Sequence, residues 1–280
     1  MIKIKTVLKP PCTYQGGKQR YSKQIIDIIY EENEINEDTK FYDLCSGSGA
    51  ISLELINRGF NPKNINMVDK SLWGLFYKLI GQSTFDIDIF KQYIDNVPND
   101  RNDIKQYIVK ISKESIDEFC IYKFLLLQST SFGGKQVDIK GDKWIHNGFR
   151  DYWQPTETSI RQSPVNPMQP VKSELFDRVK LLVENCKGVN CIYDDIINVD
   201  LIKEDNTIIY IDPPYMNTTG YNNNDFSIYD FINKNKELKL YISEGQQISD
   251  NSIRLDKSGA KGGITAKKKS RTEEWLNIIN

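Results

Sequence analysis

The chain places an acid, two prolines and an aromatic residue directly after an apolar run. Asp212, Pro213, Pro214 and Tyr215 follow residues 208–211, which predict a short buried strand. The prolines end the strand because neither can donate a backbone hydrogen bond, and they also stiffen the turn. Asp212 and Tyr215 are therefore expected at the carboxyl end of a strand, where open α/β sheets bind ligands. The simpler alternative is a strand followed by an ordinary proline-containing turn.

A second candidate site lies in "DLCSGSGAISLELI", which predicts a strand, a glycine turn and a helix. Gly47 and Gly49 allow a tight turn and the close approach of a ligand to the backbone. Asp43 precedes the turn, and Asp69 ends the next predicted strand, where an acid accepts hydrogen bonds from ribose hydroxyls. Ser52 stands where a dinucleotide fingerprint has a third glycine, which favours a single nucleoside over a pyrophosphate. S-adenosylmethionine fits because it carries a ribose and an adenine but no phosphate, although a plain strand–helix turn is the alternative.

Metal and triad chemistry are disfavoured by the residue types. His146 is the only histidine, which excludes a multi-histidine metal site and leaves a Ser-His-Asp triad a single possible base. The five cysteines have no zinc-binding spacing and are expected to be free thiols. We therefore expect no metal ion, and chemistry that depends on carboxylates, backbone groups and a cofactor.

An alternating set of strands and helices must position these residues. Strands are predicted at 40–44, 65–68, 189–193, 207–211 and 238–243, and helices at 22–35 (capped by Ser22), 51–59, 71–80, 119–128 and 172–186. This alternation predicts an α/β fold with a parallel sheet. The sheet pattern occurs in two blocks, and residues 129–170 between them show little periodicity. Such a long irregular stretch indicates a functional insertion.

Size and charge narrow the class of protein further. A chain of 280 residues is expected to form one large domain, or one domain with a sizeable insertion. The net charge of −1 means that any affinity for polyanions must come from local patches. No apolar run approaches the ~20 residues of a membrane span, and the first residues lack the apolar core of a signal peptide. We therefore expect no membrane association and a cytoplasmic location.

Three motifs together resemble the DPPY class of DNA adenine amino-methyltransferases. "PPCTYQGGK" at 10–18 looks like the P-x-x-x-x-G-G-K element of that family. "FYDLCSGSGAISLEL" at 41–55 resembles its D-x-F-x-G-S-G loop, with Cys45 in place of the usual aromatic residue, and "IYIDPPY" at 209–215 resembles its catalytic strand end. The similarity covers roughly residues 1–80 and 186–280. Within the insertion, "SFGGK" and "FRDYWQPTETSIRQSPVNP" look like phage-borne members of the family.

The resemblance implies a class-I methyltransferase, or Rossmann-like, fold with a twisted, mostly parallel sheet. Residues 1–80 and 186–280 would form the catalytic domain that binds S-adenosylmethionine, and residues 81–185 an inserted target-recognition region. The implied donor contacts are Tyr14, Gly16, Lys18, Asp43 and Gly47 at the methionine end, Asp69 at the ribose and Asp195 at the adenine, and Gly17 and Gly49 are further cofactor-binding residues. Asp194 replaces Asp195 if the register differs by one residue, and an exposed charge at a strand end is the alternative for both. In the family, Asp212 and the Pro213 carbonyl hold the target amino group, and Tyr215 stacks on a flipped base.

DNA is the expected macromolecular partner. The basic residues between 257 and 271 include Lys267, Lys268 and Lys269, with no acid among them, which suits phosphate binding. In the insertion, Lys135, Arg150 and Arg161 accompany Trp and Gln side chains that could read or stack on bases. The alternatives are a solvated charged loop for the first segment and a structural cover of the sheet edge for the second.

The expected reaction is methyl transfer to the amino group of adenine in DNA, inside a bacterial host cell and with a phage as one source of the gene. Asp212 favours adenine over cytosine N4, because serine usually replaces this acid in the cytosine enzymes. Cytosine C5 methylation is disfavoured because Pro11-Cys12 precedes the cofactor loop. The remaining alternatives are an RNA amino-methyltransferase, a nicotinamide oxidoreductase and a DNA-binding relative with an inactive site. For the oligomeric state, a monomer and a weak dimer both stay open, as does a restriction partner.

Overall fold

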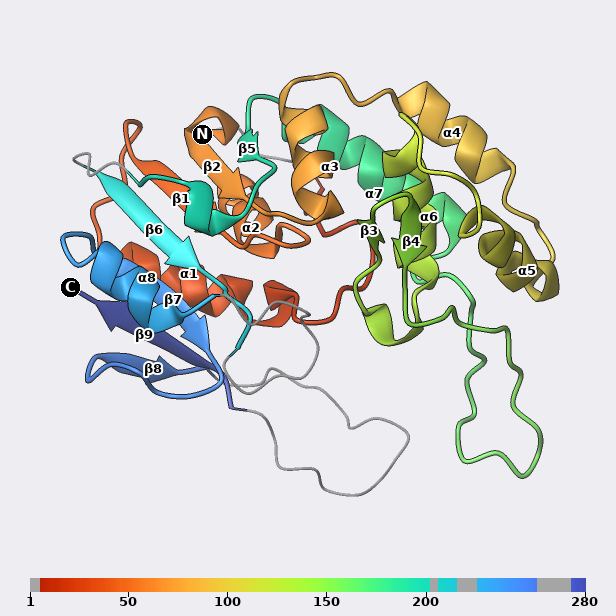
Figure 1. The fold of residues 1–280 in the computed structure, drawn as a ribbon. Coiled ribbons are helices and arrows are strands. Elements are labelled where there is room, and N and C mark those ends of the chain that lie inside the picture. The colour runs from red at the N-terminus through yellow and green to blue at the C-terminus, as the bar shows by residue number, and fades with distance from the viewer. Residues whose placement is uncertain (1–5, 202–205, 216–225, 256–272) are drawn as a thin grey trace.

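The protein is built on a seven-stranded sheet with the strand order β5-β2-β1-β6-β7-β9-β8 (Figure 1). The computed structural model describes residues 6–201, 206–215, 226–255 and 273–280. The strands are β1 (Lys40–Leu44), β2 (Ile65–Val68), β5 (Asn190–Ile192), β6 (Thr207–Ile211), β7 (Leu240–Glu244), β8 (Ser252–Arg254) and β9 (Trp275–Ile279). β5, β2, β1, β6 and β7 pair in parallel, whereas β9 is antiparallel to both of its neighbours. The predicted α/β fold with a mostly parallel sheet is confirmed.

The order in which the chain adds strands to the sheet changes direction between β1 and β6. From β1 the order continues through β2 to β5 on one side, and from β6 through β7 on the other. Leu44 of β1 is in register with Ile211 of β6, and the Asp212 amide donates to the Leu44 carbonyl oxygen at 3.1 Å. The carboxyl ends of these strands thus meet at a topological switch point, where α/β sheets bind ligands.

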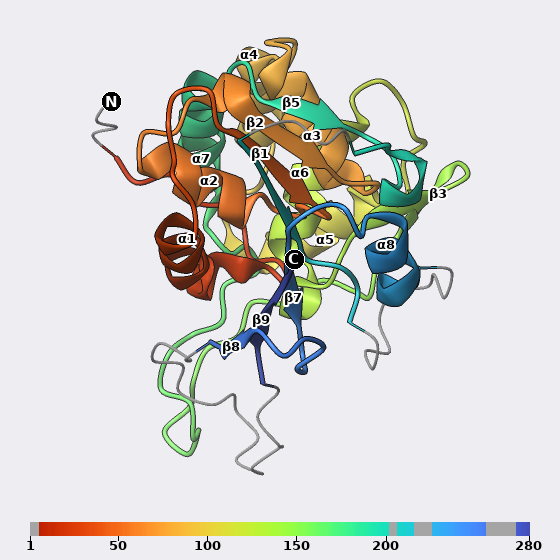
Figure 2. The same ribbon diagram turned by 90° about the vertical axis from the view of Figure 1, so that its left-hand side faces the viewer.

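Both faces of the sheet are covered, which explains the continuous apolar runs of its strands. Phe41, Met67 and Tyr210 face a large core that includes the helices α1 (Ser22–Glu31), α2 (Ala50–Asn57) and α3 (Leu72–Gly81). Ile209 and Ile242 face the opposite way, toward a smaller core that includes α8 (Ile228–Lys234). Figure 2 shows α1 and α2 on one side of the sheet and α8 on the other.

The predicted insertion packs as a group of helices beside α3 (Figure 1). Its elements are α4 (Ile87–Asp95), α5 (Arg101–Ile111), α6 (Cys120–Thr130), α7 (Lys172–Asn185) and a hairpin of β3 (Asp138–Lys140) and β4 (Lys143–Ile145). Apolar residues of α4 to α7 belong to the same hydrophobic cluster as those of α1 to α3. The insertion therefore shares its core with the sheet domain. The limits 81–185 stay a prediction.

Several predicted boundaries differ from the structure. The strands at 40–44, 65–68 and 207–211 have the expected bounds, but the helix predicted at 22–35 ends at Glu31. Ser22 is not its cap, because the 3-10 turn Lys18–Arg20 leads into the helix and Tyr21 takes the capping position. The elements α8, β8 and β9 were not predicted. Across the described residues, no helix has both the length and the apolar character that a membrane crossing requires.

Candidate active site at the carboxyl edge of the sheet

Asp212 lies directly after β6, and its carboxylate is paired with Lys18. The Lys18 Nζ is 2.6 Å from Asp212 Oδ1, and the Asp212 side chain is 17% exposed. Burial raises the pKa of Asp212 to about 6, since it disfavours the charged form. Lys18 opposes this shift, and the negative charges of Glu274 and Glu244 add to it. Asp212 is therefore a buried carboxylate that ionises near neutral pH.

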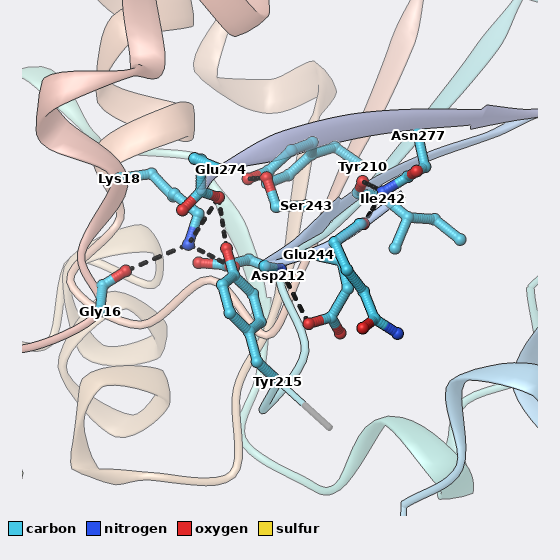
Figure 3. A network of polar contacts seen from close by, with 12 residues as sticks. Gly16, Lys18, Tyr210, Asp212, Tyr215, Ile242, Ser243, Glu244, Glu274 and Asn277 are labelled. Atoms are coloured by element: carbon cyan, nitrogen blue, oxygen red, sulfur yellow. Dashed lines mark hydrogen bonds and ion pairs between the residues drawn. The ribbon is translucent and has the colours of Figure 1, made fainter. Parts of the chain in front are cut away.

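The Lys18 ammonium is surrounded by groups from three parts of the chain (Figure 3). In addition to Asp212, its Nζ lies 3.3 Å from the Gly16 carbonyl oxygen and 3.6 Å from Glu274 Oε1. It also lies 4.8 Å from the centre of the Tyr215 ring. The short 3-10 turn after Gly17 turns the buried Lys18 toward the sheet edge. The resemblance implies that Lys18 lies at the methionine end of the donor, but in this structure it joins the DPPY segment.

Tyr215 is held at its hydroxyl and along its ring. The hydroxyl donates to Glu274, and a Cβ added to Gly245 would lie 3.3 Å from Tyr215 Cδ2. Burial raises the pKa of Tyr215, and the negative charges of Asp212 and Glu274 raise it further. Tyr215 is thus a neutral phenol held beside Asp212.

Two acidic residues of this site, Glu244 and Glu274, were not predicted. Glu244 ends β7, is 2% exposed and accepts a hydrogen bond from the Gly245 amide at 2.8 Å. Glu274 comes directly before β9. Glu244 could have been recognised as an acid at the end of a predicted strand. Glu274 carries no such signal, because β9 itself was not predicted.

The glycine turn after β1 is held by Asp69. Gly47 and Gly49 have φ angles of +49° and +79°, a region that favours glycine. Asp69 Oδ2 accepts from the Gly47 amide at 2.6 Å, and Oδ1 accepts from the Ser71 amide at 2.8 Å and hydroxyl at 2.5 Å. Burial raises the pKa of Asp69, and these donors oppose the shift. The acid expected at a ribose therefore supports the turn in this structure.

Asp43 supports the start of α2. It is 1% exposed, and its Oδ2 accepts from the Ser52 amide at 3.1 Å and the Ser52 hydroxyl at 2.6 Å. Burial raises its pKa to about 7. Ser52, which stands at the place of a third glycine, therefore contributes a hydroxyl that binds a buried carboxyl group.

The N-terminal loop lies over the glycine turn. A Cβ added to Gly47 would be 3.0 Å from Tyr14 Cε1, and the Gly17 amide donates to the Tyr14 carbonyl oxygen at 3.2 Å. The Tyr14 ring packs edge-on against Trp73, with 5.8 Å between ring centres. Gly16, whose carbonyl oxygen accepts from Lys18, has a φ of +86°. The structure thus brings together the predicted N-terminal element and the predicted glycine loop.

The "SFGGK" segment of the insertion also meets this loop. The Gln15 amide donates to the Gly134 carbonyl oxygen at 2.7 Å, and the Tyr14 hydroxyl donates to Gln136 Oε1 at 3.1 Å. Gln128, fully buried on α6, fixes the segment from below. Its Nε2 donates to the Gly134 and Lys135 carbonyl oxygens at 3.3 and 3.1 Å, and its Oε1 accepts from the Val137 amide at 2.9 Å. Sequence reasoning missed Gln128, which reads as one polar residue in an apolar helix.

Asp195, rather than Asp194, points toward the neighbouring strand end. Asp195 Oδ2 accepts a hydrogen bond at 2.8 Å from Nζ of Lys70, the residue directly after Asp69. Asp194 instead accepts from the Asp195 amide at 2.6 Å and from Asn198 Nδ2 at 2.9 Å within its own turn. The geometry favours Asp195 of the two candidates for a ligand contact.

The predicted DNA-binding residues lie in different environments. Lys135 is exposed beside the N-terminal loop. Arg161 donates to the Ser163 and Pro164 carbonyl oxygens of its own loop, at 2.8 and 3.4 Å. Arg150 is only 6% exposed and donates to the Ser129 carbonyl oxygen at 2.9 Å. The prediction that Arg150 contacts DNA at the surface is therefore wrong, and Arg150 has a structural role. Lys267, Lys268 and Lys269 lie outside the described residues.

The comparisons with known proteins identify no relative. No family model matches the chain, and no curated protein matches it. In the part of the chain that the structure describes, His, Cys, Asp and Glu side chains form no group of three suited to a metal ion. The arrangement at the sheet edge therefore has to be interpreted from its own chemistry.

Proposed function

We propose that this protein transfers a methyl group from S-adenosylmethionine to the exocyclic amino group of adenine in DNA. The proposal includes the class-I methyltransferase form of the Rossmann-like sheet. The observation that carries it is the position of Asp212 and Tyr215 at the end of β6, beside the Gly47 turn and at the switch point of the sheet. A fixed acceptor, a fixed aromatic ring and a backbone turn open to a ligand are the parts that this reaction needs.

A buried hydroxyl at this edge fits the methyl donor. The Ser46 hydroxyl of the glycine turn is buried and has no hydrogen-bond partner among the described residues, so it can bind a polar group of a ligand. When bound, S-adenosylmethionine supplies an activated methyl group on a cationic sulfur.

The glycine turn, Tyr14 and Asp195 are the residues that would hold the donor. The turn presents backbone at a point where a side chain would block approach, and Tyr14 lies against Gly47. Asp195 lies at the far side of the edge, beyond Lys70. Asp43 and Asp69 keep the turn in place through Ser52, Ser71 and the Gly47 amide.

Asp212 is the group that activates the amine in this proposal. The amino nitrogen of adenine is a poor nucleophile because its lone pair is delocalised into the ring. Asp212 accepts one N–H and the Pro213 carbonyl oxygen accepts the other, which localises the lone pair on nitrogen. With a pKa of about 6, Asp212 is ionised above neutral pH, and its charge stabilises the positive charge that develops on nitrogen. The nitrogen–carbon bond would form as the carbon–sulfur bond breaks, the sulfur would leave as a neutral thioether, and the surplus proton on nitrogen would pass to Asp212.

Tyr215 and the basic residues of the insertion are assigned to the nucleic acid. A duplex shields the target amine, so the base has to rotate out before it can react. The Tyr215 ring then provides a stacking face worth ~1–3 kcal/mol. Lys135 is exposed next to the loop that carries Lys18, so its ammonium is assigned to a DNA phosphate.

Methyl transfer can be tested directly with isotope-labelled donor. The protein is incubated with unmodified DNA or with RNA, and the digested nucleosides are analysed by mass spectrometry. N6-methyladenine in DNA is the expected product. N4-methylcytosine or a labelled RNA nucleoside would support the alternative substrates, and no label in either polymer would favour an inactive DNA-binding relative.

A pair of variants tests the assignment of Asp212. Asp212→Ala is expected to lower the turnover number by roughly 100- to 1000-fold, as for the loss of one transition-state contact. Donor affinity should stay within a few-fold of the wild type. Asp38→Ala removes an exposed carboxylate far from the edge and serves as the matched control. Wild-type turnover in Asp212→Ala would refute the assignment.

A further inference from the structure

Glu274 connects the C-terminal strand to the DPPY segment. Its side chain is 11% exposed, and its carbonyl oxygen accepts from the Leu255 amide at 2.8 Å, which fixes the residue next to β8. Its carboxylate accepts from the Tyr215 hydroxyl and lies 3.6 Å from Lys18 Nζ. One buried acid thus contacts both neighbours of Asp212 (Figure 3).

The position of Lys18 creates a conflict that the proposed reaction has to resolve. The ammonium lies 2.6 Å from Asp212 and 4.8 Å from the centre of the Tyr215 ring. These are the two groups assigned to the target amine and the target base. The ammonium occupies the space beside Asp212 Oδ1 and over the Tyr215 ring, so a base that stacks on this face and bonds to Oδ1 has to displace Lys18.

Glu274 is suited to receive the displaced ammonium. It is already within 4 Å of Lys18, so a small rotation of the lysine side chain replaces one carboxylate partner by the other. Without such a partner, a buried ammonium would lose its compensation, which is strongly unfavourable. At the same time, the bond from the Tyr215 hydroxyl keeps the ring in place as the cation leaves its face.

We propose that Glu274 is a positioning residue for methyl transfer. It keeps Tyr215 oriented for stacking, and it holds Lys18 while Asp212 binds the target amine. It does not touch the reacting atoms. This inference rests on the proposed function and adds to it a residue from the last strand of the sheet.

Glu274→Gln tests the proposal, because the amide keeps the shape of the side chain and removes its charge. The turnover number is expected to fall by about 10- to 100-fold, the range for one lost hydrogen bond to a charged group. The donor KM should stay within about twofold, because no donor contact is assigned to Glu274. Glu273→Gln is the matched control, since Glu273 is exposed and paired with Arg254 at the surface.

Two readouts separate positioning from a general structural effect. The Glu274 charge raises the pKa of Asp212, so Glu274→Gln should move the acidic limb of the activity profile to lower pH. In oligonucleotides with 2-aminopurine at the target, the fluorescence that reports a stacked, flipped base should also change. An unchanged profile together with unchanged fluorescence would overturn the proposal.

The contact itself is tested by a double-variant cycle with Tyr215→Phe, which keeps the ring and removes the hydroxyl. If Glu274 acts through that hydroxyl, the two losses of melting temperature and of turnover should not add. Fully additive losses would overturn the proposal. If the wild type transfers no methyl group, the proposed function fails, and the unfolding cycle alone then decides whether Glu274 positions Tyr215.

Discussion

The ion pair of Lys18 and Asp212 makes a prediction that needs no assumption about function. Lys18→Met keeps most of the side-chain volume and leaves the Asp212 carboxylate, 17% exposed, without the ammonium at 2.6 Å. Breaking a buried pair from one side destabilises a protein by ~3–5 kcal/mol. Because Asp212 keeps some solvent contact, we expect roughly 3 kcal/mol at pH 8, or ~6–10 °C in melting temperature.

The pH dependence of this loss is the sharper part of the prediction. In the wild type, burial holds the pKa of Asp212 at about 6, above the ordinary 3.8, so its ionised form lowers stability as the pH rises between these values. The positive charge of Lys18 lowers the pKa of Asp212 and so reduces this loss of stability. In Lys18→Met the pKa must be higher still, so the extra instability is present above about pH 6 and fades below it as Asp212 protonates. At pH 5 we expect Lys18→Met to lower the free energy of unfolding by only roughly 1 kcal/mol.

Urea denaturation at pH 5 and pH 8 measures both values. Lys91→Met is the control, because Lys91 and Asp95 form an exposed pair 46% and 60% accessible, and it should change stability by less than ~0.5 kcal/mol. Adding Asp212→Asn to Lys18→Met should restore part of the stability at pH 8. An equal loss at both pH values would refute the interpretation of Lys18 and Asp212 as a buried, coupled pair.

Four further variants examine the surroundings of the site. Asp43→Asn should flatten the fall of stability between about pH 4 and pH 7 in denaturation experiments, because burial raises the pKa of Asp43 from 3.8 to about 7 and its ionisation opposes folding. Gly49→Ala should lower the free energy of unfolding by roughly 2–4 kcal/mol, since its φ is +79° and the new Cβ would lie 2.4 Å from the Tyr77 hydroxyl. Gln128→Leu removes one donor to each of the Gly134 and Lys135 carbonyl oxygens and the acceptor of the Val137 amide, and thermal unfolding should show a loss of roughly 2–4 kcal/mol. Lys135→Ala should weaken DNA binding and lower the slope of log affinity against log salt by about one, with unchanged unfolding; an unchanged slope would remove Lys135 from the interface.

The sequence by itself determined the central part of the fold. The strands at 40–44, 65–68 and 207–211 were predicted with their observed bounds, because each is a short apolar run closed by a glycine turn, an acid or a proline pair. Local signals of this kind do not depend on distant partners. The same reasoning located Asp212 and Tyr215 at a strand end and Gly47 in a turn.

The tertiary structure alone decided how these residues meet. Lys18 reaches Asp212 across 194 positions of the chain (212 minus 18), and no local pattern specifies such a pairing. β9 and Glu274 went unpredicted because a five-residue strand between β7 and β8 is defined mainly by its long-range ladders to these two neighbours. Arg150 had the sequence context of a surface reader but is buried against α6, because tertiary packing, which local sequence does not specify, can bury even a residue type that is mostly exposed. Asp69 likewise supports the glycine turn because the Gly47 amide lies within hydrogen-bonding distance only once β1 and β2 are side by side.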